Sequence, residues 1–276
     1  MARGFNNKPQ SGSIAPAVFI TGRKGELFVK TYVDSVKLKT EVNKRSYLAK
    51  LPAVKFLMDG GELDTSAPVT VFVGENGMGK STLLEAIAVA FGFNPEGGSR
   101  NFDFSTAETH SELYEHLTLV KRAYPRDGFF LRAESYYNVA SYINELDEIP
   151  SGRPRIIDSY GGVSLHEQSH GESFLALVQN RFGGRGIYIL DEPEAALSPQ
   201  SALLLLAEMK RLIKKDSQFI IATHSPILMA FPGAKVYEFS ENGIEEKDYK
   251  ETEHFRIMKN FLHDPERMMK IVFDEE

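Results

Sequence analysis

Hydrophobic residues along this chain follow two spacings, and each spacing predicts a different kind of element. Short, mostly apolar runs at Val69–Val73, Ile187–Leu190 and Gln218–Ala222 predict β-strands, and the last two are expected to be buried. Ser81–Phe91 instead repeats its large apolar side chains every fourth residue, which predicts a helix that Gly92 ends. The chain is therefore expected to mix strands with helices.

Weaker patterns predict further elements between and after these. Expected strands lie at Glu26–Val33 and Gly128–Ala133, and an expected hairpin joins Lys235–Phe239 to Ile244–Tyr249. Expected helices lie at His110–Ala123, Val139–Leu146, Ser173–Phe182, Pro199–Lys214 and Thr252–Val272, the last with Pro265 starting a second segment.

Length and composition indicate one large folding unit. The chain has 276 residues, of which 42% are hydrophobic, and this is enough for a substantial core. Residues 1–13 are polar and predict a flexible tail, which leaves 14–276 as a single domain. The chain contains no cysteine, which excludes disulfides, thiolate zinc sites and a cysteine nucleophile.

Charge and hydropathy narrow the class of partner. The formal net charge of −6 argues against a strongly basic surface for nucleic acids. No apolar run approaches the ~20 residues needed to cross a bilayer. The polar N-terminus also lacks the apolar centre of a secretory signal. We therefore expect a cytoplasmic protein without a membrane span.

The first motif with a chemical meaning runs from Gly74 to Ser81 and fits the P-loop (Walker A) pattern G-x-x-x-x-G-K-[ST]. Its glycines let backbone N–H groups curl around phosphate oxygens, and the following helix adds its N-terminal dipole. Lys80 can reach the β- and γ-phosphates, and the Ser81 hydroxyl can bind Mg²⁺. A chance glycine-rich turn is the alternative, and the strand before and the helix after the motif argue against it. The expected nucleotide-binding residues are Gly74, Glu75, Asn76, Gly77, Met78, Gly79, Lys80, Ser81 and Thr82.

A pair of acidic residues, Asp191 and Glu192, follows directly after the expected strand Ile187–Leu190, as in a Walker B motif. Ligands of open α/β sheets bind at the carboxyl ends of the strands, so both carboxylates are expected at that edge. Asp191 can hold Mg²⁺, directly or through water, and Glu192 can polarise the water that attacks ATP. A buried strand followed by an acidic turn is the plain structural alternative, and the P-loop upstream disfavours it.

The segment 168–173 reads QSHGES and precedes an expected helix. It resembles the LSGGQ signature of ABC ATPases, in the LSGGE form of chromosome-maintenance and recombination-repair members, with Ser169, Gly171 and Glu172 at matching positions. The first and third residues of the segment depart from that pattern. Ser169 followed three residues later by Glu172 is also an ordinary capping box at a helix start, and both interpretations can hold.

The buried run Gln218–Ala222 continues into Thr223-His224-Ser225-Pro226. A strand that ends here brings His224 to the same edge of the sheet as the P-loop. The residue resembles the switch histidine of ABC ATPases, which contacts the γ-phosphate. A surface histidine that caps a strand is the alternative.

The resemblance to ABC ATPases carries implications for fold, cofactors and partners. It implies an α/β P-loop fold with a mixed sheet flanked by helices, an N-terminal antiparallel β subdomain, and a helical subdomain at about 100–182 that carries the signature. It also implies ATP and Mg²⁺ as cofactors, and an ATP-dependent homodimer in which Ser169 of one copy reads the γ-phosphate held by the other. The whole chain resembles a group of small stand-alone bacterial predicted ATPases related to the chromosome-maintenance and recombination-repair (SMC/RecF-like) branch.

Three further expectations rest on weaker signals. Transporter cassettes place a metal-sensing glutamine between P-loop and signature, whereas residues 81–167 contain none. Glu134 is the expected substitute as a metal ligand, with a surface acid at a strand end as an equal alternative. Arg100 occupies the place of an arginine near the nucleotide in chromosome-maintenance ATPases, although a solvated arginine is the commoner case. The candidates to stack on adenine are Tyr32, Tyr47 and Phe56, and each is more typical of a core.

Three functions stay open from the sequence. The first is a mechanochemical ATPase of the chromosome-maintenance type, acting with an unknown protein partner in DNA repair or defence. No heptad repeat is visible, so DNA binding has no visible platform. The second is the ATP-binding subunit of a membrane transporter, against which the missing glutamine and the signature count. The third is a non-hydrolytic ATP-sensing regulator, and the intact Asp191–Glu192 pair argues instead for turnover.

Overall fold

A computed structural model of the chain describes residues 30–100, 111–133, 136–148, 155–163 and 169–273. The strands are β1 (Val33–Leu38), β2 (Leu63–Asp64), β3 (Val69–Gly74), β4 (Leu117–Lys121), β5 (Asp127–Arg132), β6 (Gly186–Asp191), β7 (Gln218–Ala222), β8 (Lys235–Ser240) and β9 (Gly243–Lys247). The α-helices are α1 (Pro52–Met58), α2 (Lys80–Phe91), α3 (Leu113–His116), α4 (Tyr136–Glu148), α5 (His170–Arg181), α6 (Pro199–Ile213), α7 (Pro226–Met229), α8 (Glu253–His263) and α9 (Pro265–Val272). The 3-10 helices are η1 (Leu48–Lys50), η2 (Ile156–Tyr160), η4 (Pro193–Ala196) and η5 (Tyr249–Glu251).

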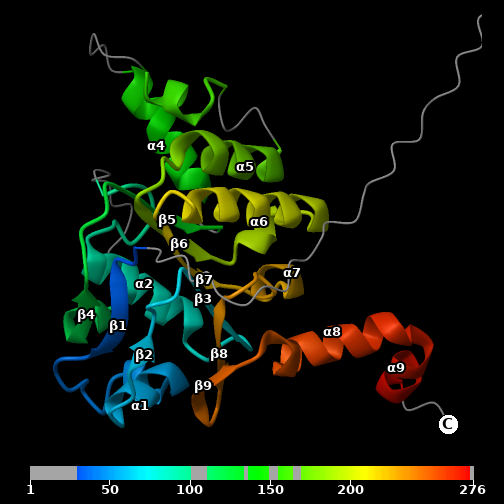
Figure 1. The fold of residues 1–276 in the computed structure, drawn as a ribbon. Helices are drawn as coiled ribbons and strands as arrows, with labels where there is room; N and C mark the ends of the chain where they lie inside the picture. Colours follow the sequence, from blue (N-terminus) through cyan, green and yellow to red (C-terminus); the bar gives the residue numbers. More distant parts are fainter. Residues whose placement is uncertain (1–29, 101–110, 134–135, 149–154, 164–168, 274–276) are drawn as a thin grey trace, which may run out of the picture.

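A six-stranded sheet in the order β5-β6-β7-β3-β8-β9 forms the centre of the fold (Figure 1). The first five strands in this order pair in parallel, and β9 pairs antiparallel with β8 as the expected hairpin. Parallel neighbours need long crossover connections, which the helices supply. Because β6, β7 and β3 are neighbours that point the same way, the segments that follow them emerge at one edge of the sheet.

The central sheet is buried on both faces because its side chains alternate between two apolar cores. On β3, Val71 belongs to the core shared with α5 and α6, whereas Phe72 belongs to the core shared with α2. On β6, Leu190 belongs to the core shared with α5 and α6, and Ile189 belongs to the core shared with α2. Figure 1 shows α5 and α6 on one side of the strands and α2 on the other. This two-sided burial explains why these strands carry almost no polar residues.

A second, antiparallel sheet in the order β2-β1-β4 packs on the α2 side of the molecule. Its presence confirms the α/β fold with an N-terminal antiparallel subdomain. The helix expected at His110–Ala123 is wrong over most of its length, because only Leu113–His116 is helical and β4 follows directly. Pairing of Leu117 with Leu38 on β1 gives this segment a buried partner strand, which overrides its local helical pattern.

Other boundaries also differ from the expectation. Most of the strand expected at Glu26–Val33 lies outside the described residues, and β1 begins at Val33. The range 100–182 expected for the helical subdomain contains α3, α4, η2 and α5, but it also contains β4 and β5, which belong to the two sheets. The C-terminal helical segment is confirmed, with Pro265 at the start of α9.

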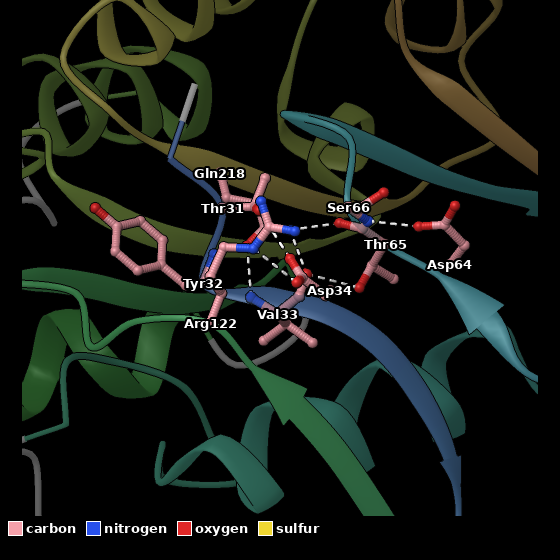
Figure 2. Close-up of polar contacts among 9 residues, drawn as sticks. All are labelled: Thr31, Tyr32, Val33, Asp34, Asp64, Thr65, Ser66, Arg122 and Gln218. Carbon is pink, nitrogen blue, oxygen red and sulfur yellow. Dashed lines mark hydrogen bonds and ion pairs between the residues drawn. The ribbon is translucent and has the colours of Figure 1, made fainter. Parts of the chain in front are cut away.

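Gln218, at the start of β7, ties the small sheet to the central one (Figure 2). Its Oε1 accepts hydrogen bonds from the backbone N–H groups of Tyr32 at 2.8 Å and Val33 at 3.0 Å. Its Nε2 donates to the carbonyls of Val33 at 2.8 Å and Thr65 at 2.6 Å. The amide is fully buried and uses both donors and both acceptor sites, so no other side chain can replace it.

Replacing Gln218 with Leu is expected to lower the free energy of unfolding by about 3 kcal/mol, because buried backbone groups lose their partners. The drop should appear as a lower denaturation midpoint in urea, measured by circular dichroism. Gln179→Leu, on the exposed face of α5, is the matched control and should leave the midpoint nearly unchanged. Equal midpoints for the two variants would refute a role for Gln218 in joining the sheets.

Candidate functional site

The loop from Gly74 to Lys80 connects β3 to α2 and depends on glycine at two points. Gly74 has a φ of 134°, and a Cβ there would lie 2.2 Å from the carbonyl oxygen of Phe239. Gly79 has a φ of 91° and is the N-cap of α2. The loop therefore turns tightly onto the helix start, where the first N–H groups lack helical partners and suit an anion.

Lys80 lies at the centre of this loop. Only 4% of the residue is exposed, and its Nζ donates to the carbonyls of Gly74 at 2.6 Å and Glu75 at 2.8 Å. Burial lowers the pKa of the Lys80 ammonium, and the negative charges of Glu192 and Asp191 counteract part of that effect. The acidic pair predicted from the sequence is thus close enough to act on the lysine.

Ser81 and Asp191 meet directly. The Ser81 hydroxyl donates to Oδ1 of Asp191 at 2.9 Å, although 110 positions separate them in the sequence. Asp191 ends β6 and is buried, and Ser81 stands in the first turn of α2. A hydroxyl and a carboxylate are oxygen donors, and Mg²⁺ bound with a nucleotide typically uses few protein ligands besides phosphate and water. The pair fits a magnesium site.

Glu192 and His224 face each other across the same edge. Glu192 has a left-handed φ of 48°, which is uncommon for a residue other than glycine. Nε2 of His224 lies 3.7 Å from Oε1 of Glu192, and within the described part of the chain this buried nitrogen has no hydrogen-bond partner. Burial, and next the charge of Lys80, lower the pKa of His224, so the imidazole is neutral at pH 7.

Glu194, which the sequence analysis did not single out, holds the backbone that carries the histidine. Its carboxylate accepts hydrogen bonds from the Thr223 hydroxyl at 2.7 Å and from the backbone N–H of His224. The Thr223 oxygen in turn accepts from the N–H of Ser225 at 2.9 Å. The end of β7 is therefore tied to the turn that follows Glu192. The sequence did contain a signal for Glu194, because it is a third acidic residue only two positions after Glu192.

Arg132 is a second residue that sequence reasoning missed. It ends β5 in register with Asp191, and its Nε lies 3.6 Å from Oδ2 of that carboxylate. Its Nη1 donates to Glu85 of α2 at 2.6 Å. Glu85 is buried and also accepts the N–H of Ser111 at 3.1 Å. A chain of ion pairs thus reaches the Asp191 carboxylate from α2.

The signature segment stands on a different surface. Ser169 is the N-cap of α5, and the capping box is confirmed: the Ser169 N–H donates to Glu172 at 3.1 Å, and the Ser169 oxygen accepts from the Glu172 N–H at 3.4 Å. Both side chains are exposed. A Cβ on Gly171 would lie 3.0 Å from the carbonyl of Ala196 in η4. Among the described residues no hydrogen bond links this segment to the P-loop, so its nucleotide role stays a prediction.

Several known ATP-binding proteins are similar to this chain. A family described as "AAA domain" matches residues 43–159, and one described as "AAA domain, putative AbiEii toxin, Type IV TA system" matches residues 122–230. An uncharacterized ABC transporter ATP-binding protein of Haemophilus influenzae is 25% identical over 207 residues, which cover 70% of this chain and 76% of that protein. The cytochrome c biogenesis ATP-binding export protein CcmA of Rhizobium meliloti is 27% identical over 198 residues, which cover 68% of this chain and 88% of CcmA. The chain is thus similar to ABC-type P-loop ATPases.

Solved structures that are similar to this chain include the SMC head domain from Thermotoga maritima. That structure is 17% identical, covers 79% of this chain and 99% of its own, and has a TM-score of 0.41. Throughout the described ranges, none of the helices combines the length and apolar character needed to span a bilayer.

Two further expected site residues, Arg100 and Glu134, lie away from the contacts described above or outside the described residues. Arg100 is exposed, and its guanidinium donates to the carbonyl of Pro125 at 3.1 Å. Glu134 lies outside the described residues. The nucleotide role of Arg100 and the metal role of Glu134 therefore stay predictions.

The three aromatic candidates for adenine stacking differ in how far they are buried. Tyr32 is buried, and its hydroxyl donates to the carbonyl of Asp216, just before β7 and so at the opposite edge of the sheet from the P-loop. Phe56 is partly buried against the α2-side core. Tyr47 is 60% exposed. Tyr32 is thus a core residue, which leaves the other two as candidates.

Arg132→Met is expected to lower the free energy of unfolding of this chain by about 2 kcal/mol, because it leaves the buried Glu85 carboxylate without its cation. Adding Glu85→Gln should recover part of the loss, since the uncompensated charge disappears. Arg155→Met breaks the exposed pair with Asp158 and should cost under about 0.5 kcal/mol. Urea denaturation of these three variants and of Glu85→Gln alone measures this, and full additivity of the Arg132 and Glu85 effects would contradict the coupling.

Proposed function

We propose that this chain binds ATP with Mg²⁺ and hydrolyses it to ADP and phosphate, and that ATP joins two copies head to tail. One observation carries the proposal: Lys80, the Ser81–Asp191 pair and the Glu192–His224 pair converge at the carboxyl ends of three neighbouring parallel strands. Glycine conformation and open helix N–H groups at the same place suit a triphosphate.

The residues divide into holding and reacting groups. The P-loop backbone and Lys80 bind the phosphates, while Ser81 and Asp191 hold Mg²⁺, which neutralises phosphate charge when bound. Glu192 takes the proton of the attacking water, and its side chain is 40% exposed, so water can reach it. His224 is neutral, and its Nε2 is free to donate a hydrogen bond to the γ-phosphate.

The second copy completes the site. Ser169, Gly171 and Glu172 form the capped start of α5; Ser169 and Glu172 are exposed, and Gly171 rests on η4. In a twofold dimer this surface meets the triphosphate held by the partner copy, so ATP bridges both copies. Loss of the γ-phosphate removes these contacts and releases the dimer.

Phosphate release by the purified chain tests this proposal. We expect steady release with Mg²⁺ and ATP, none with EDTA, and dimers in sedimentation velocity only with ATP. Tight ATP binding without any phosphate release would instead identify a non-hydrolytic ATP sensor. The chain is expected to act in the cytoplasm, where ATP is available.

A second candidate function rests on the curated relatives. The H. influenzae protein is named as an ABC transporter ATP-binding protein, and CcmA as an ATP-binding export protein. The chain is therefore proposed, as the alternative, to be the ATP-binding subunit of a membrane transporter. Recovery of a membrane protein with the tagged chain from detergent extracts, at equal stoichiometry, would favour this function over a stand-alone ATPase.

A further inference from the structure

The two C-terminal helices form an amphipathic arm, defined as α8 and α9, which projects from the body (Figure 1). Its exposed apolar side chains are Ile257, Met258, Phe261 and Leu262 on α8, and Met269, Ile271, Val272 and Phe273 on and after α9. Leu262 is 73% exposed, and no residue of either helix is buried. An apolar surface this continuous indicates a partner.

The root of the arm is fixed beside the candidate ATP site. The His254 ring lies 5.6 Å from the His224 ring, centroid to centroid. The backbone N–H of Glu253 donates to Glu238 of β8 at 2.6 Å. Thr252, just before α8, is fully buried. The arm therefore starts in contact with the switch histidine and leaves the body from there.

We propose that the arm packs on a second copy of this chain when ATP closes the dimer. The inference rests on the proposed function, which brings the second copy to the edge of the sheet where the arm begins. The receiving surface is the exposed apolar pair Leu203 and Leu204 on α6, which are 57% and 47% exposed. Both leucines lie in the first turns of α6. The signature surface is near them, because Gly171 lies against η4, which comes just before α6. In the proposed dimer this surface faces the partner copy.

The size of the arm fits a twofold interface. The arm presents eight exposed apolar side chains, which include Phe261 and Phe273, and each large aromatic side chain can bury about 150–250 Å². A specific interface buries about 800 Å² on each partner. In a twofold dimer the same contact forms twice, once for each arm.

The charges of the arm favour a protein partner over a lipid surface. Four cationic side chains are accompanied by three acidic ones, so the polar faces are nearly neutral; the residues are Arg256, Lys259, Arg267 and Lys270 against Glu253, Glu266 and, between the two helices, Asp264. Helices that lie on anionic membranes are instead rich in lysine and arginine on their polar face.

Cross-linking between copies tests the contact, because the natural chain has no cysteine. In a Glu192→Gln background, a size-tagged Leu262→Cys copy is mixed with a Leu204→Cys copy and treated with a short bis-maleimide. We expect the mixed covalent dimer with ATP and its loss with ADP. Asn260→Cys, on the polar side of α8, replaces Leu262→Cys in the control and should give at most one tenth as much product. Equal yields from Asn260→Cys and Leu262→Cys would overturn the contact.

A second measurement separates this inference from the proposed function. Ile257→Glu with Leu262→Glu should raise the dissociation constant of the ATP-bound Glu192→Gln dimer at least tenfold and leave ATP affinity unchanged. Asn260→Glu is the control and should change neither. If the dimer forms and is unaffected by the arm variant, the arm inference fails and the dimer stands. If Glu192→Gln binds ATP and stays monomeric, both fail. Binding of the parent chain to anionic lipid vesicles, abolished by the arm variant, would assign the arm to a membrane and overturn the inference.

Discussion

Glu192→Gln is expected to reduce the rate of phosphate release by about 10²- to 10⁴-fold, because an amide cannot accept the proton of the attacking water. ATP binding should persist, since Lys80, Ser81 and Asp191 are unchanged. Glutamine keeps the size of the side chain and its hydrogen-bonding oxygen, so the left-handed turn at this position has no new reason to rearrange. The bound ATP then stays intact, and the variant should accumulate as a dimer.

Two measurements test the expected effect of Glu192→Gln. Single-turnover hydrolysis of labelled ATP reports the chemical step, and sedimentation velocity with and without ATP reports the dimer. Glu241→Gln, an exposed acid in the β8–β9 turn, is the matched control and should behave like the parent. A Glu192→Gln variant that hydrolyses ATP at the parent rate would remove Glu192 from the reaction. One that binds ATP as a monomer would remove the head-to-tail dimer.

Lys80→Ala should raise the dissociation constant for ATP at least about a hundredfold, since charge-assisted hydrogen bonds to phosphate contribute about 1.5–3 kcal/mol each. The ammonium is buried in the loop and is the cation nearest to where the phosphates are expected among the contacts described. Without it, the carboxylates of Asp191 and Glu192 would repel the triphosphate. Isothermal titration calorimetry with the non-hydrolysable analogue of ATP measures the loss directly.

The control for Lys80→Ala is another lysine near the P-loop. Lys55→Ala removes an exposed cation from α1, the helix that packs beside the P-loop, and should leave the ATP affinity within about twofold. Lys80→Met keeps most of the apolar stem and separates loss of charge from loss of packing. Unchanged ATP affinity in both Lys80 variants, with an intact fold by circular dichroism, would exclude the P-loop as the nucleotide site.

Several parts of the site followed from local patterns. The P-loop could be recognised because its function depends on short-range features, namely glycine φ angles and the start of a helix directly after a strand. Asp191 and His224 could be assigned to one edge because each follows a buried strand, and parallel strands place their carboxyl ends together. The capping box at Ser169 and Glu172 is likewise local, since three residues of sequence define it.

Other parts depended on contacts that no local pattern records. Glu194 accepts the backbone N–H of His224 from a position 30 residues away, and Arg132 reaches Glu85 across 47 residues. Such pairs involve charged residues that, taken singly, are indistinguishable from solvated surface residues. Gln218 gives no hint in the sequence that it joins two sheets.

The apolar runs, the glycines and the order of the motifs were therefore enough to predict a P-loop α/β fold and the sheet edge where its chemistry is expected, because those features act over a few residues. The strand at Leu117–Lys121 and the ion pairs behind Asp191 required the folded chain. An amphipathic segment acquires its conformation from whichever partner buries it, here β1, and a buried charge persists only where a distant counter-charge meets it.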